Sequence, residues 1–137
     1  MISLERLAKE AKRAADLSYS PYSHFRVGAA LYVEGDLIFS GTNVENASYG
    51  LTICAERNAI FQAVAHGYRK IKHIVIYAPS LTATTAPCGA CRQVIKEFAD
   101  EDTLITDVCD SEQILQFTME ELLPKAFGPD NLLKRKG

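Results

Sequence analysis

The order of local sequence patterns in this 137-residue chain predicts an α/β fold, with a central sheet covered on both faces by helices. Short apolar runs bounded by turn residues, which are typical of strands, alternate with longer segments of helical period. No internal repeat, low-complexity block or linker divides the chain. The length suits one domain with its own core and is short for two, so we expect a single domain over residues 1–137.

A helix and a β-hairpin are expected first. Ser3 is a suitable N-cap for a helix that continues to about residue 17 and carries Leu and Ala along one side. The apolar runs 27–33 and 37–44 are separated by a Glu-Gly-Asp turn, which predicts two paired strands. Gly28 and Gly41 are poor strand formers, so their presence in these runs predicts close approach of another backbone.

The remainder of the chain alternates between helices and strands. A helix that begins at Cys54 should end at His66, because a glycine, Gly67, commonly follows the last helical turn. The later elements are recognised by apolar runs and turn residues. In chain order they are a strand at 71–77, a helix from 88 to about 100, strands at 103–108 and 114–118, and a short helix at 119–123 before Pro124.

Composition excludes several classes of function. The charged and apolar fractions, 23% and 47%, are those of a globular protein, and a net charge of −2 provides no basic field for a nucleic-acid backbone. No apolar run is long enough to span a membrane, and the N-terminal residues lack the hydrophobic block of a signal peptide. We therefore expect a cytoplasmic protein, in which clustered cysteines serve as metal ligands or catalysts rather than in disulfides.

Three cysteines lie at the starts of two expected helices. Cys54 precedes one helix, and Cys88 and Cys91 begin another. The positive end of a helix dipole favours thiolate, the form that binds metal. Two such helix ends would offer three sulfurs to one Zn²⁺ and leave the fourth position open, as in catalytic zinc sites. Glu56, two residues after Cys54, would then be a carboxylate beside the metal that is free to carry protons.

The C-x-x-C spacing alone is weak, because redox pairs and structural zinc knuckles share it. The proline before it, Pro87, and the upstream Cys-Ala-Glu at another helix start make a catalytic zinc the better interpretation. Three thiolates make such a site formally negative, so a compensating charge is needed. Arg57 and Arg92, each close to a ligand in sequence, are the candidates.

Residues 23–31, 43–47, 54–57 and 87–93 together resemble the small zinc-dependent cytidine deaminases. The segment 121–124 with Phe127 is also similar, so the resemblance covers nearly the whole chain. It implies the fold of that family, a three-layer α-β-α sandwich with a central mixed five-stranded sheet. It also implies a reaction: hydrolytic deamination of cytidine and deoxycytidine to uridine and deoxyuridine, with release of ammonia, as in pyrimidine salvage.

The resemblance assigns roles around the metal. One Zn²⁺ per chain would be held by Cys54, Cys88 and Cys91, and water activated by the metal would attack C4 of the base. Glu56 would carry protons from that water to the pyrimidine N3 and to the departing amino group. In this subclass the arginine at the position of Arg57 hydrogen-bonds a ligand sulfur.

The resemblance also assigns substrate contacts. Asn43 and Glu45 lie two residues apart, so their side chains point the same way if the backbone is extended, and the family uses these positions for ribose hydroxyls. Phe25 resembles the aromatic residue that packs on the base, and Ala55 is a further substrate-binding position. With Glu45 near the sugar and no phosphate cradle in the sequence, we expect nucleotides to be rejected.

Two aromatic residues point to an assembly. Tyr49 and Phe127 resemble residues that the family contributes to the pocket of a neighbouring subunit, and the all-cysteine members are homotetramers. The resemblance therefore implies a homotetramer with active sites shared between subunits.

Two other functions remain open at the level of sequence. One is a related deaminase that acts on a modified cytosine, such as a nucleoside antibiotic. The other is a zinc-stabilised binding module, which needs a fourth protein ligand. Only Cys109 could supply a fourth sulfur, and we expect it to be a small buried residue in a strand, away from both helix starts. The three histidines, His24, His66 and His73, have no metal-like spacing to the cysteines.

Overall fold

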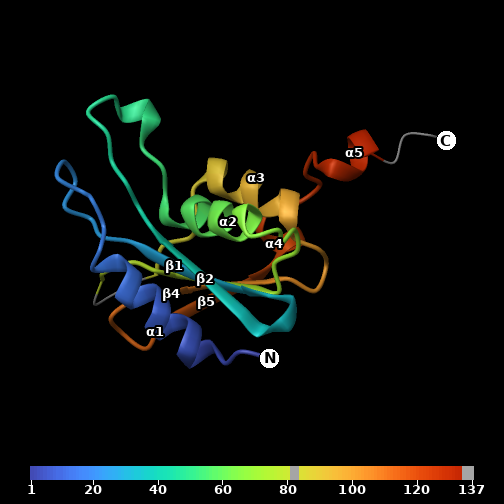
Figure 1. Cartoon of the computed structure of the whole chain (residues 1–137), viewed down its shortest axis with the longest axis horizontal. Helices are drawn as coiled ribbons and strands as arrows, with labels where there is room; N and C mark the ends of the chain where they lie inside the picture. Colours follow the sequence, from blue (N-terminus) through green and yellow to red (C-terminus); the bar gives the residue numbers. More distant parts are fainter. Residues whose placement is uncertain (81–83, 134–137) are drawn as a thin grey trace.

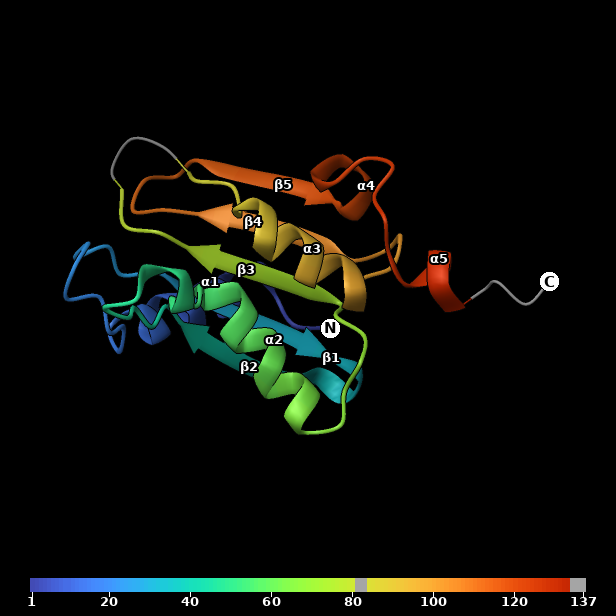
Figure 2. The same cartoon turned by 90° about the horizontal axis from the view of Figure 1, so that it is seen from above.

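A mixed five-stranded sheet forms the centre of the molecule, with α1 on one face and α2 and α3 on the other (Figures 1 and 2). The computed structural model describes residues 1–80 and 84–133. In chain order the elements are α1 (Leu4–Ala15), β1 (Gly28–Val33), the 3-10 turn η1 (Glu34–Asp36), β2 (Leu37–Thr42), a second 3-10 turn η2 (Tyr49–Leu51), α2 (Ala55–Ala65), β3 (His73–Tyr77), α3 (Gly89–Phe98), β4 (Leu104–Val108), β5 (Ile114–Thr118), α4 (Met119–Leu122) and α5 (Pro129–Leu133). The expected three-layer α-β-α sandwich is confirmed.

The strand order is β2-β1-β3-β4-β5. β1 pairs antiparallel with both β2 and β3, β3 pairs parallel with β4, and β4 pairs antiparallel with β5. A parallel pair needs a crossover connection, and α3 provides it between β3 and β4. As a result α3 begins at the end of the sheet where β3 finishes, which is also where α2 begins (Figure 2).

Helix ends follow the sequence signals. The Ser3 side chain accepts a hydrogen bond from the backbone N–H of Arg6 at 3.2 Å, which makes it the N-cap of α1. α2 ends at His66, and Gly67 follows with a φ of +95°, a conformation that favours glycine. Thr118 caps α4 in a reciprocal capping box with Glu121. The short helix α5, which begins at Pro129, was not expected from the sequence.

The helices pack very closely on the hairpin. A Cβ atom on Gly28 would lie 1.8 Å from the carbonyl oxygen of Ala11 in α1. One on Gly41 would lie 2.4 Å from the backbone nitrogen of Ala59 in α2. Both positions therefore need glycine for space, as predicted, and they bring the two helix layers within backbone contact of the sheet.

Cys109 differs from the expectation. β4 ends at Val108, and Cys109 is a half-buried residue in the turn that follows, not a buried residue within the strand. Its Sγ lies 3.1 Å from the hydroxyl of Ser111, because the chain already turns here towards β5. The histidines are structural or exposed: buried His73 contacts Thr106, with Nε2 and Oγ1 2.8 Å apart.

Two further expectations concern a membrane-spanning helix and the basic run near the C-terminal end. Among the described residues, no helix has the length and apolar character needed to cross a membrane. The basic run at 134–136, which we expected to be a solvated tail, lies outside the described residues.

Candidate metal centre and active site

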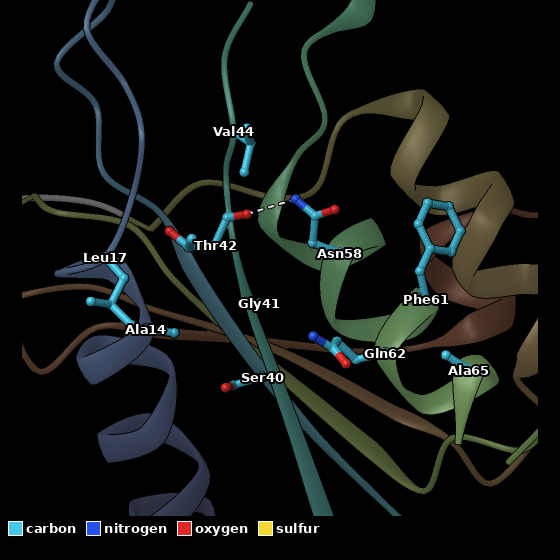
Figure 3. Close-up of a pocket in the computed structure, with 10 residues that line it drawn as sticks. All are labelled: Ala14, Leu17, Ser40, Gly41, Thr42, Val44, Asn58, Phe61, Gln62 and Ala65. Carbon is cyan, nitrogen blue, oxygen red and sulfur yellow. Dashed lines mark hydrogen bonds between the residues drawn. The ribbon is translucent and has the colours of Figure 1, made fainter. Parts of the chain in front are cut away.

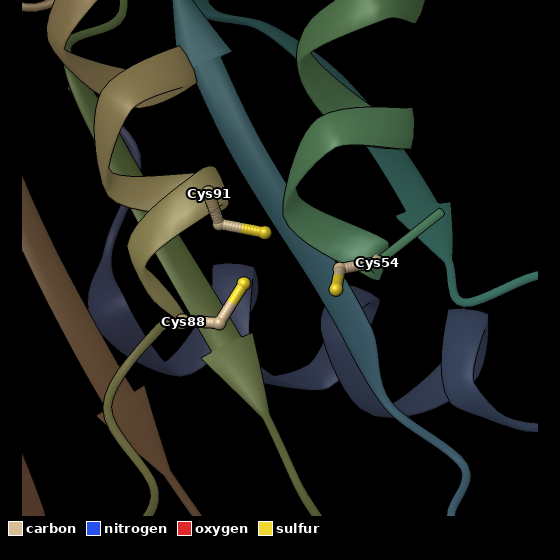
Figure 4. A group of neighbouring side chains, drawn as sticks. All are labelled: Cys54, Cys88 and Cys91. Atoms are coloured by element: carbon tan, nitrogen blue, oxygen red, sulfur yellow. The ribbon is translucent and has the colours of Figure 1, made fainter. Parts of the chain in front are cut away.

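The starts of α2 and α3 meet and bring three cysteines together (Figure 4). Cys54 is the N-cap residue of α2, Cys88 is that of α3, and Cys91 lies in the first turn of α3. Their Sγ atoms all lie within 4.8 Å of one another. Neither N-cap sulfur makes a capping hydrogen bond to its own helix, so both sulfurs can face the shared space between the helix ends.

This donor set fits one zinc ion. Zn–S bonds of about 2.3 Å in a tetrahedron place the sulfurs about 3.8 Å apart, a distance that falls within the 4.8 Å limit on the observed spacing. Cys109 is not part of the cluster within the described residues, so a fourth cysteine ligand is not at hand. Three protein ligands leave one tetrahedral position for water or substrate, which is the arrangement of a catalytic site.

Hydrogen bonds to Cys54 prepare it as a thiolate. A hydrogen bond from the Cys91 thiol, assisted by the Arg57 guanidinium, lowers the pKa of Cys54 to about 5 in spite of partial burial. Nη2 of Arg57 lies 3.6 Å from the Cys54 Sγ and donates to it. Arg92, the other candidate, donates instead to the backbone carbonyls of Pro87 and Leu122, each at 2.8 Å. Arg57 is therefore the arginine that brings its charge to the cysteines, while Arg92 fixes the loop that leads to Cys88.

Glu56 lies next to the cysteines and is almost fully enclosed, with 5% of its surface exposed. Burial, and next the nearby Cys54 charge, raise the pKa of Glu56 above that of an ordinary glutamate. A carboxyl group whose pKa moves towards neutrality can both take up and give back a proton. Its position in the first turn of α2 follows directly from the Cys-Ala-Glu sequence at the helix start.

A cavity of about 310 Å³ opens beside the cysteines. Its walls are mainly apolar, from residues such as Val27, Ile76 and Ala78. Most of the substrate and metal positions expected from the sequence line it, namely Phe25, Asn43, Glu45, Cys54, Ala55, Glu56 and Cys88. An apolar slot with a few convergent polar groups is the usual form of a small-molecule site.

Sequence reasoning missed several lining residues. Ser23, Thr52, Thr85 and Ala86 also border the cavity. They are small or hydroxyl-bearing residues in loops, where no periodic pattern marks a side chain as facing inward. Only Ser23 carried a signal, since it begins one of the segments that resemble the deaminases.

Asn43 holds the loop that carries Phe25. Its side-chain oxygen accepts hydrogen bonds from the Ser18 hydroxyl at 2.6 Å and the Val27 N–H at 3.0 Å. Its amide nitrogen donates to the Phe25 carbonyl at 2.8 Å. Asn43 is buried, so these bonds lie away from water and fix the position of one cavity wall.

Glu45 is bound to the same loop from the other side. It accepts hydrogen bonds from the backbone N–H groups of Tyr22 and Ser23 at 3.0 and 3.1 Å, and from the Ser23 hydroxyl. The Ser23 hydroxyl, more than any other group, lowers the pKa of Glu45. The side chain is therefore a carboxylate at neutral pH, at the edge of the cavity.

Tyr49 and Phe127 lie outside this cavity. They are 77% and 61% exposed, and neither lines the pocket of its own chain. Tyr49 projects with the loop before α2 and contacts the ring edge of Tyr22, with centroids 6.0 Å apart. Phe127 follows α4, where its carbonyl accepts a hydrogen bond from Gln93 at 2.9 Å.

Comparison with known proteins agrees with this geometry. Residues 1–106 match the family described as the cytidine and deoxycytidylate deaminase zinc-binding region. The chain belongs to this family. Zinc-dependent deamination of cytidine is the known reaction of these enzymes, which are hydrolases.

Individual relatives of the cytidine deaminase family match over nearly their full length. The cytidine deaminase of Sporosarcina psychrophila is 41% identical over 131 residues, which cover 96% of each chain. That of Halalkalibacterium halodurans is 43% identical over 128 residues, 93% of this chain and 96% of its own. The crystal structure of cytidine deaminase from Burkholderia pseudomallei superposes with a TM-score of 0.87 at 41% identity, covering 92% of this chain and all of the other.

Proposed function

We propose that this protein catalyses the zinc-dependent hydrolytic deamination of cytidine and deoxycytidine to uridine and deoxyuridine, as a single catalytic domain over residues 1–137. The observation that supports the proposal most strongly is the meeting of three cysteines and a buried glutamate at one apolar cavity. Full-length relatives named cytidine deaminase support the same reaction.

Cys54, Cys88 and Cys91 would hold one Zn²⁺, with Arg57 donating to the Cys54 sulfur. A zinc ion with one free position lowers the pKa of water from about 15.7 towards about 7, and so supplies the nucleophile. The three thiolates weaken this effect by their charge. The Arg57 guanidinium and the N-terminal ends of α2 and α3 offset that charge.

Glu56 would move the protons. It accepts a proton from the attacking water and gives one to N3 of the cytosine, which makes C4 electrophilic. The new C4–O bond forms, and Glu56 then transfers the remaining proton to the amino group. The C4–N bond breaks and ammonia leaves. A raised pKa suits Glu56 to these alternating roles as base and acid.

The cavity would hold the nucleoside by its base and sugar. The base would lie against Phe25 and the apolar wall. The backbone N–H of Ala55 is in the first turn of α2, where a helix offers it no carbonyl partner, and it would donate to the base carbonyl. Asn43 and Glu45 would face the ribose hydroxyls. Their hydrogen bonds to the loop over 18–27 keep them in place before the substrate arrives.

One sample of purified protein tests the reaction. We expect about one zinc per chain and a fall in ultraviolet absorbance when cytidine is converted to uridine. Glu56→Gln should keep the zinc and the fold and lose activity by at least about a thousandfold. Glu97→Gln, the same change on the exposed side of α3, should have no effect. Zinc without turnover of cytidine, but with turnover of an antibiotic-type cytosine, would replace the proposal with the modified-cytosine reaction.

Rejection of nucleotides is part of the proposal. Glu45 is a carboxylate at the cavity edge, so a substrate phosphate near it would meet a like charge. Cytidine monophosphate should therefore be a poor substrate. A rate on the monophosphate equal to that on cytidine would contradict this.

We further propose a homotetramer in which neighbours complete each active site. Tyr49 and Phe127 are exposed and project beyond the cavity of their own chain. A groove of about 560 Å³ crosses the edge strand β2 between α1 and α2, with Leu17 and Phe61 on opposite sides (Figure 3). These side chains are 72% and 47% exposed, which favours burial against another copy.

Mixing two inactive variants tests the sharing of residues. Glu56→Gln lacks the proton carrier, and Phe127→Ala lacks the aromatic ring offered to a neighbour. If Phe127 acts in the next subunit, tetramers reassembled from both variants should regain part of the activity, since some sites then combine both intact residues. Mixtures that stay as inactive as their components would contradict sharing, and light scattering would give the oligomeric state.

A cytoplasmic location completes the proposal. The three ligand cysteines bind zinc only as thiolates, and a reducing compartment keeps them from forming disulfides. Loss of zinc and activity on mild oxidation, with recovery after reduction, is the expected result. Zinc content and activity that both survive the same oxidation would argue against this dependence.

A further inference from the structure

Asp107 is a buried acid that the proposed reaction does not use. It lies in β4 with 1% of its surface exposed. Within the described part of the chain, neither of its carboxylate oxygens has a hydrogen-bond partner. Buried polar groups are nearly always paired, so a carboxyl group in this state needs an explanation.

The sheet register places Asp107 beneath the active site. Its partners across the ladder are Ile76 in β3 and Leu115 in β5. Because side chains alternate along a strand, Asp107 shares its face with Ile105, which packs in the core under α2 and α3. Ile76 on the same face lines the active-site cavity. Figure 2 shows α3 lying over β3 and β4, on this side of the sheet.

The charged groups near Asp107 come from the two helices. From α2, Glu56 acts on it as a like charge, and from α3, Arg92 acts as an opposite charge. Glu56 in turn lies beside Cys54 and Cys91. The strand neighbours on this face, Ile76 and Leu115, are uncharged. Arg92 makes its hydrogen bonds to the carbonyls of Pro87 and Leu122 and forms no ion pair with Asp107 among the described contacts.

This environment disfavours a charge on Asp107. Burial, and next the negative charge of Glu56, raise the pKa of Asp107 to about 8. At neutral pH the group is therefore mainly a neutral acid. At higher pH the Asp107 carboxylate would lie next to Glu56 and close to a site with three thiolates, with no hydrogen-bond donor to stabilise its charge. Such a charge is stabilised only by contact with water, which needs an opening of the layer above it.

The layer above Asp107 is the helix that holds two zinc ligands, Cys88 and Cys91. We propose that the protonation state of Asp107 decides whether α3 stays packed on the sheet, and we call this residue a pH-dependent lock on α3. This inference rests on the proposed zinc site. While it keeps its proton, α3 closes on the sheet and the metal is held. When the proton leaves, α3 separates from the sheet and the zinc is released.

Zinc release from the holoenzyme tests the lock. The rate of transfer to a zinc-binding dye is measured from about pH 6.5 to about pH 9.5 for the wild type, Asp107→Asn and Asp110→Asn. The wild-type rate should rise by up to about tenfold per pH unit, the limit for one ionising group, from about pH 6.5 to about pH 8, and level off above about pH 8, where the group has already lost its proton in the closed state. Asp107→Asn should show less than a twofold rise, because the amide stays neutral. Asp110 follows the same strand but bonds Tyr77, so its variant should behave as the wild type.

The sign of the effect separates the lock from ordinary titration of the ligands. Thiols lose protons as pH rises, which strengthens zinc binding and slows release. Faster release at high pH in the wild type, abolished by Asp107→Asn, thus supports the lock. Equal pH dependence in the two proteins, or slower wild-type release at high pH, would overturn it.

Two controls keep the result readable. If Asp107→Asn does not fold, Asp107→Thr removes the charge with a residue that favours strands, and the same outcome is expected. Zinc content and cytidine turnover at pH 7 are measured on each sample. Absence of zinc or turnover in the wild type would refute the proposed function, whereas normal zinc and turnover without the alkaline release would refute the lock alone.

Discussion

Substitution of Gly41 by alanine should damage the zinc site from a distance. Gly41 lies in β2, where α2 crosses the sheet. Its added Cβ would meet the backbone nitrogen of Ala59 at 2.4 Å, the carbonyl carbon of Asn58 at 2.8 Å and the carbonyl oxygen of Ala55 at 2.9 Å. All three atoms belong to the backbone of α2, so no side-chain rotation relieves the clash, and the helix itself must move.

The size of the effect follows from these distances. Ordinary contact lies near 3.4 Å or beyond, so α2 must shift by roughly 1 Å. Overpacking of this kind lowers the unfolding free energy by about 1–3 kcal/mol. Because the atoms that clash belong to the helix backbone, we expect the loss for Gly41→Ala to lie at the upper end of this range. Zinc geometry tolerates only about 0.2 Å. Because α2 carries Cys54 and Glu56 while α3 carries the other two ligands, the shift should lower kcat/KM by about a hundredfold.

Urea unfolding, zinc content and turnover of cytidine are the measurements. Gly89→Ala is the matched control, since Gly89 lies between two ligands in α3 and its Cβ would meet nothing within 4 Å. The control should keep zinc and activity and gain up to about 1 kcal/mol in stability. A Gly41→Ala protein with unchanged unfolding free energy, zinc and kcat/KM would refute the reasoning.

Two further substitutions test the groups around the cavity. Arg57→Ala removes the donor to Cys54, so the pKa of that thiol should rise and protons should compete better with zinc. Zinc affinity should fall by about 10- to 100-fold, and the loss should be larger at pH 6 than at pH 8. Equal zinc affinities of the wild type and Arg57→Ala at pH 6 would contradict this. Asn43→Ala leaves the Val27 N–H and the Phe25 carbonyl without partners, and should cost about 2–4 kcal/mol in urea unfolding. Asn43→Asp keeps the acceptor and should lose less; equal losses would show that the bond to Val27 contributes nothing.

Much of the fold could be predicted because its signals are local. A cap such as Ser3, the turn between the first two strands and the glycine after α2 each depend on a few adjacent residues. The Glu56 position relative to Cys54 is similarly local, since two residues at a helix start fix the spacing. α5 was missed because it is only five residues long, too short for a periodic pattern.

The substrate loop could be predicted only in part. The sequence placed Asn43 and Glu45 together on an extended segment, and both line the cavity. Their hydrogen bonds to residues around Ser23 join positions more than fifteen residues apart. Hydroxyl and amide groups in loops carry no periodicity, so their partners are decided by how the two loops meet. The roles of these residues towards the substrate stay predictions.

The sequence by itself determined the order of all the elements except α5 and the 3-10 turns, and the places of the three candidate cysteines and the glutamate at the helix starts, because each depends on neighbours along the chain. Only the tertiary structure decided which residues of different strands lie side by side and which helices cover them. In the sequence Asp107 is only one residue of an expected strand, whereas the register with Ile76 places it under α3 near Glu56. The period of a strand tells which residues share a face, whereas the charge and the water that each one meets depend on the elements that pack over that face.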